Sequence, residues 1–398
     1  MDNILQVPGF KAAAVKSGIR GKDRLDLGLI VSEGPAAAAG VFTTSRVKAA
    51  PVVLDMERLD KGGRAQAILV NSGIANACTG ENGRRQALLA SRLAAEALGI
   101  EEDLVQVAST GVIGEQIDMD CFRKGIPLLV EKLAESGLPE VARAIMTTDT
   151  VPKTAVRVVE LGGRQVTIAG LAKGSGMIMP NMATMLSFVL TDAKIEPALL
   201  SRLLAKAVGK SFNAITVDGD TSTNDTLLLL ANGMAGNTPF APGSPDYARF
   251  EEALVDLCRE LALMIVRDGE GATKLVTVRV TGAASELEAD LAARTVANSN
   301  LVKTAFFGED ANWGRIIAAL GRSGAAFDPG RVDIAFNQVF MVRDGLGQGK
   351  EVEKSATEVL RQKEFTVEIN LKAGGFVREI YTCDFSIDYV KINADYRT

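Results

Sequence analysis

The sequence predicts an α/β protein with a large α/β body, residues 1–275, and a smaller α/β unit at 276–398. Three observations support this. Short apolar runs bounded by Gly, Asn or Asp recur along the chain and have the length of buried strands. Longer stretches with helical spacing of apolar residues lie between them. Near the end of the chain the alternation of apolar and polar residues sharpens. No linker rich in Pro or Ser marks the boundary between the two parts.

The predicted elements of the body alternate in type. Strands are expected at Ala67–Val70, Leu104–Ala108, Leu186–Leu190, Leu227–Ala231 and Leu275–Val280. Helices are expected at Arg85–Leu98, Pro197–Val208 and Tyr247–Val266. Pro197 suits a first helical turn, where its missing N–H costs nothing, and Gly269 can end the helix before it. In the smaller unit we expect strands at Val332–Phe336 and Phe365–Leu371, with a helix at Ala356–Gln362 between them.

The composition excludes several kinds of catalytic site. The chain has no histidine. This rules out Ser-His-Asp and Cys-His catalysis and every histidine-ligated zinc site. The formal net charge of −5 argues against a nucleic-acid binder, which would usually carry a basic face. No metal site and no cofactor are predicted.

The four cysteines and the amino terminus bear on the compartment. Cys78, Cys121, Cys258 and Cys383 lie far apart with no CxxC pair, so we expect reduced and mostly buried thiols. The first residues lack the apolar segment of an export signal, and no stretch reaches the roughly 18 apolar residues of a membrane helix. The sequence therefore predicts a cytoplasmic globular protein.

Several loops are denser in Thr, Asp, Asn and Gly than turns require. Any one of them is more often a turn or a helix cap than a site. Strand ends followed by Gly-rich turns are nevertheless where α/β proteins place their ligands, so several such loops favour a small-molecule site. The loops are VNSGIANACTG (70–80), ASTGVIG (108–114), MTTDT (146–150), FNAITVDGDTSTNDT (212–226), RDGEGAT (267–273) and FGEDANWGR (307–315).

The segment KGSGMIMPNMATML (173–186) allows three interpretations. It is a weak match to a phosphate-binding loop, because it contains neither GxxxxGK[ST] nor GxGxxG. Its methionines could fill an irregular gap in the core, but that leaves the glycines and Pro180-Asn181 unexplained. The third interpretation is a processed nucleophile. Without histidine, a Thr can use its own α-amine as the base once the chain is cut before it. Thr184 fits, because a small residue precedes it and the apolar run MLSFVL follows it.

Long motifs along almost the whole chain resemble those of the ornithine/glutamate N-acetyltransferases of arginine biosynthesis. Their order is the same as in that family, so chance similarity is excluded. The motifs are GVFTTSRVKAAPV, VNSGIANACTG, ASTGVIGE, IMTTDT, AKGSGMIMPNMATML, ITVDGDTSTNDT, VRDGEGATK, VKTAFFGEDANWGRI and DYVKINADYRT.

This resemblance implies a processing step, a fold and an activity. The chain is expected to cut itself between Ala183 and Thr184 into an α chain (1–183) and a β chain (184–398), which associate as an α2β2 heterotetramer. The fold is expected to be a layered αββα sandwich similar to that of N-terminal-nucleophile hydrolases. Thr184 is expected to take the acetyl group from N-acetylornithine as an ester and to pass it to glutamate.

The resemblance also assigns roles to individual residues. Thr110 and Gly111 are implied as the oxyanion hole. The substrate-binding positions are implied at Thr150, Lys173, Thr184, Glu270, Asn393 and Thr398. These roles are chemically reasonable: Lys173 suits a substrate carboxylate, Glu270 suits an ammonium group, and Gly111 lets a backbone N–H approach closely. Losing one oxyanion donor typically costs about 2.7–4 kcal/mol.

Two other functions remain open at this point. A hydrolase of related fold would pass the acyl group to water, and a non-catalytic amino-acid-binding protein would remain uncut. Within the family, some members use only N-acetylornithine, while others also accept acetyl-CoA. No motif separates these two kinds, and we favour the second, in which acetyl-CoA is a further substrate.

Overall fold

The computed structural model describes residues 5–21, 23–179 and 185–395. The predicted cleavage residues Ala183 and Thr184, and the predicted binding residue Thr398, lie outside these ranges. The chain forms two compact units. The larger unit contains the residues up to Asn213 together with Asp220–Ile265, and the smaller unit contains Ala214–Gly219 and the chain from Val266 onward.

The larger unit is built on an eight-stranded sheet with the order β4-β3-β2-β8-β7-β6-β5, and β1 pairs with β2 beside this path. Most neighbouring strands are antiparallel, but β3–β4 and β7–β8 are parallel. The strands are β1 (Phe10–Val15), β2 (Leu27–Phe42), β3 (Arg64–Ile74), β4 (Val105–Val112), β5 (Lys153–Leu161), β6 (Arg164–Lys173), β7 (Leu186–Thr191) and β8 (Thr226–Ala231).

The long strand β2 joins the two halves of this sheet. Its first part, Leu27–Ser32, pairs with β1 on one side and with β3 on the other. The register with β3 shifts between Val31 and Ala36, and Ala37–Phe42 then pair with β8. Pro35 lies within the shifted stretch, where a missing N–H interrupts no ladder. One strand therefore belongs to both halves.

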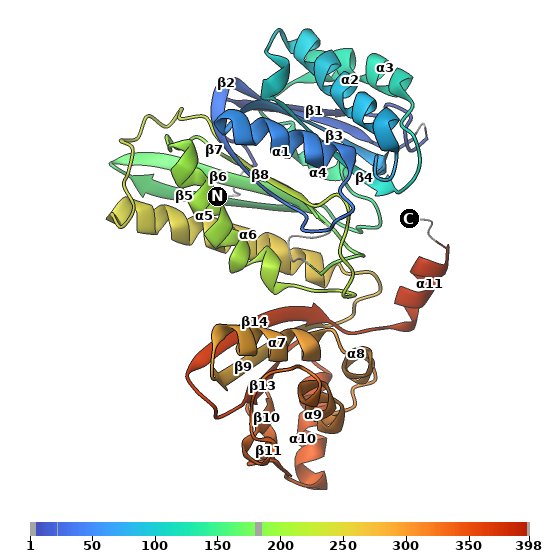
Figure 1. Ribbon diagram of the computed structural model, residues 1–398, viewed down its shortest axis with the longest axis vertical. Helices are drawn as coiled ribbons and strands as arrows, with labels where there is room; N and C mark the ends of the chain where they lie inside the picture. Colours follow the sequence, from blue (N-terminus) through green and yellow to red (C-terminus); the bar gives the residue numbers. More distant parts are fainter. Residues whose placement is uncertain (1–4, 22, 180–184, 396–398) are drawn as a thin grey trace. The chain divides into compact units, whose positions relative to one another are not determined.

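Helices cover the outer faces of the two half-sheets, as Figure 1 shows. Buried side chains of α1, α2 and α3 pack on β1–β4. In the other half, Gly170 of β6 lies against Leu257 and Leu261 of α6, and α5 lies beside α6. The helices are α1 (Ala50–Gly62), α2 (Gly80–Leu98), α3 (Met119–Lys132), α4 (Leu138–Ala144), α5 (Pro197–Gly209) and α6 (Pro245–Arg267).

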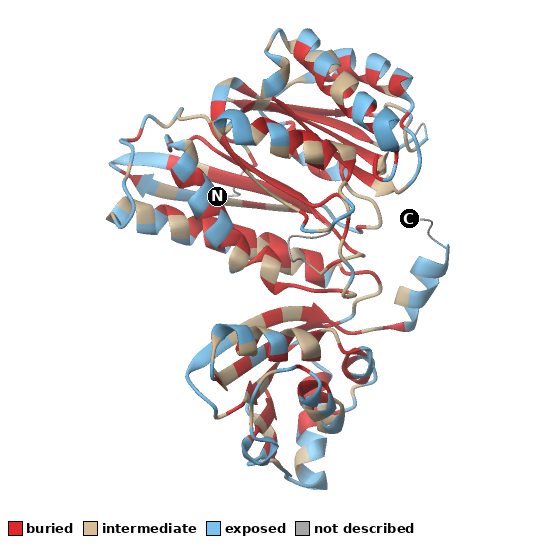
Figure 2. Ribbon diagram, viewed as in Figure 1, coloured by how far each residue is buried: buried red, intermediate tan, exposed pale blue. Residues whose placement is uncertain are grey.

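A second apolar layer lies between the two half-sheets. It combines side chains from β1–β3 with side chains from β6–β8, and α4 contributes Leu138 and Val141. The strands that carry these residues are buried along most of their length (Figure 2). The order of layers is thus helices, half-sheet, half-sheet, helices. This confirms the layered αββα fold that the family resemblance implied.

The smaller unit has a six-stranded sheet with the order β12-β11-β10-β13-β9-β14, in which only β13 and β9 are parallel. Alternate residues of β9 and β13 are buried, and α7–α10 pack on that face. The strands are β9 (Leu275–Ala283), β10 (Asp333–Phe336), β11 (Val339–Arg343), β12 (Leu346–Gly347), β13 (Glu364–Asn370) and β14 (Phe376–Cys383). The helices are α7 (Glu286–Ala297), α8 (Asn300–Phe307), α9 (Trp313–Gly321), α10 (Lys350–Leu360) and α11 (Ile387–Asp395).

The elements predicted from periodicity are all present with the predicted type. Pro197 occupies the start of α5, and the N–H of Gly269 closes the end of α6 on the carbonyl of Val266. All four cysteines are free, as expected. The prediction that they are mostly buried is wrong for two of them, because Cys78 is exposed and Cys121 is partly exposed. Within the described ranges, no helix is both long enough and apolar enough to cross a membrane.

Candidate active site

Thr110 and Gly111 lie near the carboxyl end of β4, where they pair with Ser72 and Gly73 of β3. Gly111 has a φ of +130°, and a Cβ there would lie 2.2 Å from the backbone carbon of Gly73 on β3. Only glycine fits, because the adjacent backbone occupies the space that a side chain would need. Thr110 is 9% exposed, so its hydroxyl is near the surface of the site without being freely solvated.

A buried amide fixes the end of β4. Asn224, 6% exposed, donates from its Nδ2 to the carbonyls of Ser109, at 2.8 Å, and of Ala75, at 2.6 Å. Asn71 accepts a hydrogen bond from the Ser109 hydroxyl at 2.7 Å. Three predicted loops, 70–80, 108–114 and 212–226, are thereby held together around Thr110.

Lys173 brings a positive charge to Thr110. It is the last residue of β6, is 5% exposed, and donates from its Nζ to the Thr110 hydroxyl at 3.3 Å. Along the sheet, β4 and β6 are separated by four other strands. The two side chains meet because the sheet folds back on itself into two layers.

Asp149 compensates the charge of this lysine. It accepts hydrogen bonds from the Nζ of Lys153 and from the N–H of Gly174, both at 2.7 Å. Burial alone would raise the pKa of Asp149, but the charges of Lys173 and Lys153 outweigh it and lower that pKa to about 2. Asp149 is therefore a carboxylate at neutral pH, and it stabilises two buried ammonium groups.

Asp225 lies directly beside the residue that follows Thr184. Its Oδ1 accepts the N–H of Met185 at 2.6 Å, and its Oδ2 has no hydrogen-bond partner among the described residues. Complete burial raises the pKa of Asp225 well above its usual range. A carboxyl group with a spare oxygen thus lies at the start of β7.

The smaller unit brings two further predicted residues together. Oε2 of Glu270, which is 7% exposed, accepts a hydrogen bond from Nδ2 of Asn393 at 2.8 Å. Asp384 holds the loop that carries Glu270, because it accepts hydrogen bonds from the N–H groups of Thr273 and Lys274, at 2.8 and 3.0 Å. A carboxylate and an amide in this arrangement can bind an ammonium group.

The structure therefore groups most of the predicted residues into two sets. Thr110, Gly111 and Lys173 lie together in the larger unit, and the exposed Thr150 follows Asp149 in the chain. Glu270 and Asn393 lie together in the smaller unit. Sequence analysis missed the individual roles of Asp149, Lys153, Asn224 and Asp225. The loops MTTDT and FNAITVDGDTSTNDT contain three of them, so the signal was present, but nothing in a sequence shows which loop carboxylates are buried.

The chemistry available to the larger unit is anion binding. The Thr110 hydroxyl and the buried ammonium group of Lys173 lie at one point, and both favour developing or permanent negative charge. No group of three or more acidic or cysteine residues able to hold a metal ion occurs within the described part of the chain.

Comparison with known proteins identifies the family of the chain. The sequence profile of the ArgJ family matches residues 11–398. The arginine biosynthesis bifunctional protein ArgJ of Desulfotalea psychrophila is 57% identical over 394 residues, which cover 99% of this chain and 100% of that protein. The protein of the same name from Geobacter sulfurreducens is 54% identical over 394 residues, with the same coverage.

A solved structure is also similar. The crystal structure of the arginine biosynthesis bifunctional protein from Bacillus halodurans superposes with a TM-score of 0.52 at 45% sequence identity. The match covers 54% of this chain and 100% of that chain. The family resemblance inferred from the motifs is thereby confirmed.

Proposed function

The chain belongs to the ArgJ family and is an acetyltransferase of arginine biosynthesis, and from this premise we propose that it moves an acetyl group from N-acetylornithine to glutamate through Thr184. The observation that carries the proposal is the contact between Lys173 and Thr110. It places a buried cation beside a hydroxyl that can donate to an oxyanion, in a chain without histidine.

The nucleophile is created by processing. Cleavage between Ala183 and Thr184 converts the amide nitrogen of Thr184 into an α-amine, which titrates near 7.7–8.0 in model peptides. That amine can accept the proton of the Thr184 hydroxyl. Asp225 supports this step through Met185, the residue after Thr184. One carboxyl oxygen of Asp225 accepts the N–H of Met185, and the other has no hydrogen-bond partner among the described residues.

The transfer then takes place in two half-reactions. The Thr184 oxygen attacks the acetyl carbonyl of N-acetylornithine while the α-amine takes the hydroxyl proton. The carbon–nitrogen bond breaks, and the proton passes to the leaving nitrogen. Ornithine then departs, and the acetyl group remains on Thr184 as an ester. The neutral α-amine of glutamate next attacks that ester. The ester bond breaks, one proton returns to the Thr184 oxygen, and acetylglutamate leaves.

The side chains near Thr110 stabilise the negative charge of both half-reactions. Thr110 and the backbone at Gly111 face the oxygen that becomes negative in each tetrahedral intermediate. Lys173 binds the substrate carboxylate, and Asp149 offsets the cost of burying that lysine. Thr150 and the chain end at Thr398 complete the proposed substrate contacts.

Glu270 and Asn393 account for the choice of donor. The side chain of ornithine ends in an ammonium group, which a buried carboxylate attracts and an amide oxygen can accept. The side chain of glutamate is an anion, which Glu270 repels. We therefore expect Glu270 to affect the first half-reaction more than the second.

The proposal extends to assembly and to a second donor. The two chains produced by cleavage are expected to stay together as an α2β2 heterotetramer in the cytoplasm. The word "bifunctional" in the names of the relatives supports a second activity, and we propose acetyl-CoA as its acetyl donor. No resident cofactor is needed for either reaction.

Intact mass spectrometry and transfer kinetics test the proposal. Purified protein should consist of two chains that begin at Met1 and Thr184, and Thr184→Ala should give one uncut and inactive chain. Initial rates at several concentrations of both amino-acid substrates should give parallel double-reciprocal lines, because ornithine leaves before glutamate reacts. Acetylornithine hydrolysed at one rate with and without glutamate would instead establish a hydrolase, and an uncut wild type with full activity would exclude the α-amine as base.

A further inference from the structure

A cavity of about 470 Å³ lies in the larger unit, between the amino-terminal ends of α1 and α2. Its polar lining comes from Arg46, Lys48, Glu81 and Arg84, and the exposed Cys78 also lines it. Ala50, Val53 and Leu54 of α1 supply an apolar wall. Small-molecule sites commonly have this size and this mixture of apolar walls with a few charged groups.

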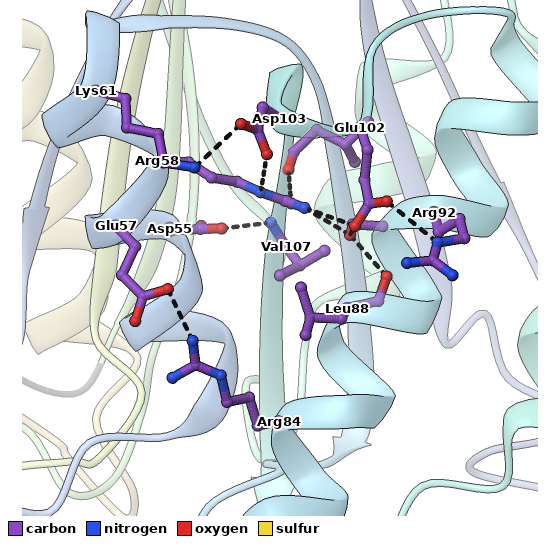
Figure 3. Close-up of polar contacts among 12 residues, drawn as sticks. Asp55, Glu57, Arg58, Lys61, Arg84, Leu88, Arg92, Glu102, Asp103 and Val107 are labelled. Carbon is purple, nitrogen blue, oxygen red and sulfur yellow. Dashed lines mark hydrogen bonds and ion pairs between the residues drawn. The ribbon is translucent and has the colours of Figure 1, made fainter.

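The charge of the cavity is positive. Arg46, Lys48 and Arg84 line it, against the carboxylate of Glu81 and that of Glu57, which pairs with Arg84. Arg46 is exposed and forms no ion pair with any described residue. The Nζ of Lys48 donates to the carbonyl of Ser45 at 2.6 Å, so its charge is not neutralised. Arg84 pairs with Glu57 of α1 at 3.2 Å, as Figure 3 shows. This arrangement of cations favours an anionic ligand.

The backbone at the same place adds hydrogen-bond donors. The helix α2 has 19 residues, and its cap residue Thr79 makes no side-chain capping bond. The first N–H groups of this helix, those of Gly80 and Glu81, meet no acceptor in the described part of the chain. Unpaired N–H groups at a helix start bind phosphate oxygens well, because they carry the positive end of the helix dipole.

The cavity is connected to the candidate active site by short hydrogen bonds. Thr43, just before the loop that carries Arg46 and Lys48, donates its N–H to the carbonyl of Asp225 at 3.0 Å. Ala49, just after it, donates to the carbonyl of Thr223 at 2.9 Å. The loop that carries Arg46 and Lys48 is therefore attached at both ends to the segment that holds Asn224 and Asp225.

We propose that this cavity binds the phosphate groups at the nucleotide end of acetyl-CoA, so that the acetyl thioester extends toward the site around Thr110 and Lys173. The assignment rests on the proposed use of acetyl-CoA as a second donor. Acetyl-CoA carries several phosphate charges at one end and its acetyl group at the other, which matches a cationic cavity linked to an acyl-transfer site. N-acetylornithine carries no phosphate and does not need the cavity.

Alkylation of Cys78 provides a test that is independent of activity. The rate at which iodoacetamide labels Cys78 is measured by peptide mass spectrometry, with Cys121 in the same digest as the internal control. The probes are 3′-phospho-ADP, ADP, inorganic phosphate and pantetheine, none of which carries an acetyl group. Saturating 3′-phospho-ADP should slow labelling of Cys78 about tenfold and leave Cys121 unchanged, and pantetheine should have no effect.

The alternatives give different patterns of protection. Equal protection by inorganic phosphate, ADP and 3′-phospho-ADP at equal concentration would assign the cavity to free phosphate and overturn the assignment to acetyl-CoA. Unchanged labelling of Cys78 with every probe would remove the site altogether.

Substitution of Arg46 tests the link to the reaction. Arg46→Ala should raise the KM for acetyl-CoA about tenfold, with kcat and the KM for N-acetylornithine unchanged. Arg322→Ala, an exposed arginine of the smaller unit, is the matched control and should change neither. If Arg46→Ala used acetyl-CoA with an unaltered KM, the assignment of the cavity to acetyl-CoA would be overturned, while the proposed function would remain intact. Protection of Cys78 by 3′-phospho-ADP in an enzyme that cannot use acetyl-CoA would support the phosphate site and refute the donor role.

Discussion

The larger unit contains two buried clusters of charge whose central carboxyl groups behave in opposite ways. One surrounds Asp149 with Lys153 and Lys173, at the end of β6. The other surrounds Asp55 with Arg58, between α1, α2 and β4 (Figure 3). Both carboxyl groups are almost inaccessible to solvent. The pKa of Asp149 is lowered to about 2, whereas the pKa of Asp55 is raised well above its usual range.

The two pKa values differ because the neighbouring cations contact Asp55 and Asp149 differently. For Asp55, burial is the largest influence, and one hydrogen bond from the N–H of Val107 and the charge of Arg58 do not offset it. Arg58 donates to the carbonyl of Val105, to Ser91 at 2.9 Å and to Glu102 at 3.2 Å. Its charge is therefore directed mainly at groups other than Asp55. Asp149, in contrast, is beside two lysines, and one of them donates to it directly.

Buried charge in the scaffold and buried charge in the site make different contacts. In the Arg58 cluster the hydrogen bonds of the guanidinium link α1 to β4, to the segment just before β4 and to α2, so the cluster holds α1 and α2 in place. In the Asp149 cluster one lysine also reaches Thr110. The first arrangement should contribute mainly to stability, and the second should contribute to both stability and acetyl transfer.

The largest effect is expected from Asp149→Ala. This change leaves Lys153 fully buried without its carboxylate, and breaking a buried ion pair in this way costs about 3–5 kcal/mol. Urea unfolding measures that loss, and acetyl transfer by the folded fraction should fall as well. Because the low pKa makes Asp149 stabilising above pH 4, that contribution should disappear in wild type as the pH falls from about 4 to 2. A variant as stable as wild type at pH 7 would contradict this role.

Lys173→Ala should reduce acetyl transfer more than it reduces stability. Loss of a hydrogen bond to a charged substrate group costs about 1.5–3 kcal/mol, or roughly 10- to 150-fold in rate. Asp149 keeps Lys153 as its partner, so the unfolding midpoint should change little. Both half-reactions are measured separately, and both should be slowed. Equal rates in wild type and variant would show that Lys173 does not bind the substrate carboxylate.

Arg58→Met should show the reverse pattern. The carbonyl of Val105 and the hydroxyl of Ser91 lose a donor, and a buried group without its partner costs about 1–3 kcal/mol. Glu102 retains Arg92 at 3.2 Å, which limits the loss. Chemical denaturation should show the destabilisation, while acetyl transfer at 25 °C should stay within about twofold of wild type. A large loss of transfer with unchanged stability would remove the distinction between the two clusters.

Asp55→Asn should give the smallest effect, about 1 kcal/mol or less near pH 4, because the amide oxygen can still accept the N–H of Val107. The folded state of wild type keeps a proton on Asp55 that the unfolded chain releases above about pH 3.9, so wild type loses stability as the pH rises. The variant lacks this dependence and should gain stability relative to wild type between pH 4 and 7. Parallel stability curves for the two proteins would show that Asp55 is ionised when folded.

The type of each predicted element and the class of chemistry could be read from the amino-acid sequence. The apolar runs of β7 and β8 and the spacing in α5 and α6 are local patterns, and they survive in the fold because these two strands are buried along their whole length and each helix buries one face. The absence of histidine, together with Ala183-Thr184 before an apolar run, pointed to a processed threonine. The family motifs named Thr110, Gly111, Lys173 and Glu270, and the structure pairs each of the last two with another predicted residue.

Which charged side chains act together depends on the folded arrangement of the layers. Thr110 and Lys173 belong to strands that four others separate in the sheet, and they meet at 3.3 Å because β2 carries the sheet from one layer into the next. Asp55 and Asp149 are both aspartates in the sequence, and nothing local shows that the pKa of one is raised and the pKa of the other lowered. Burial and the direction of neighbouring cations set those pKa values, and both arise only when the layers close on each other.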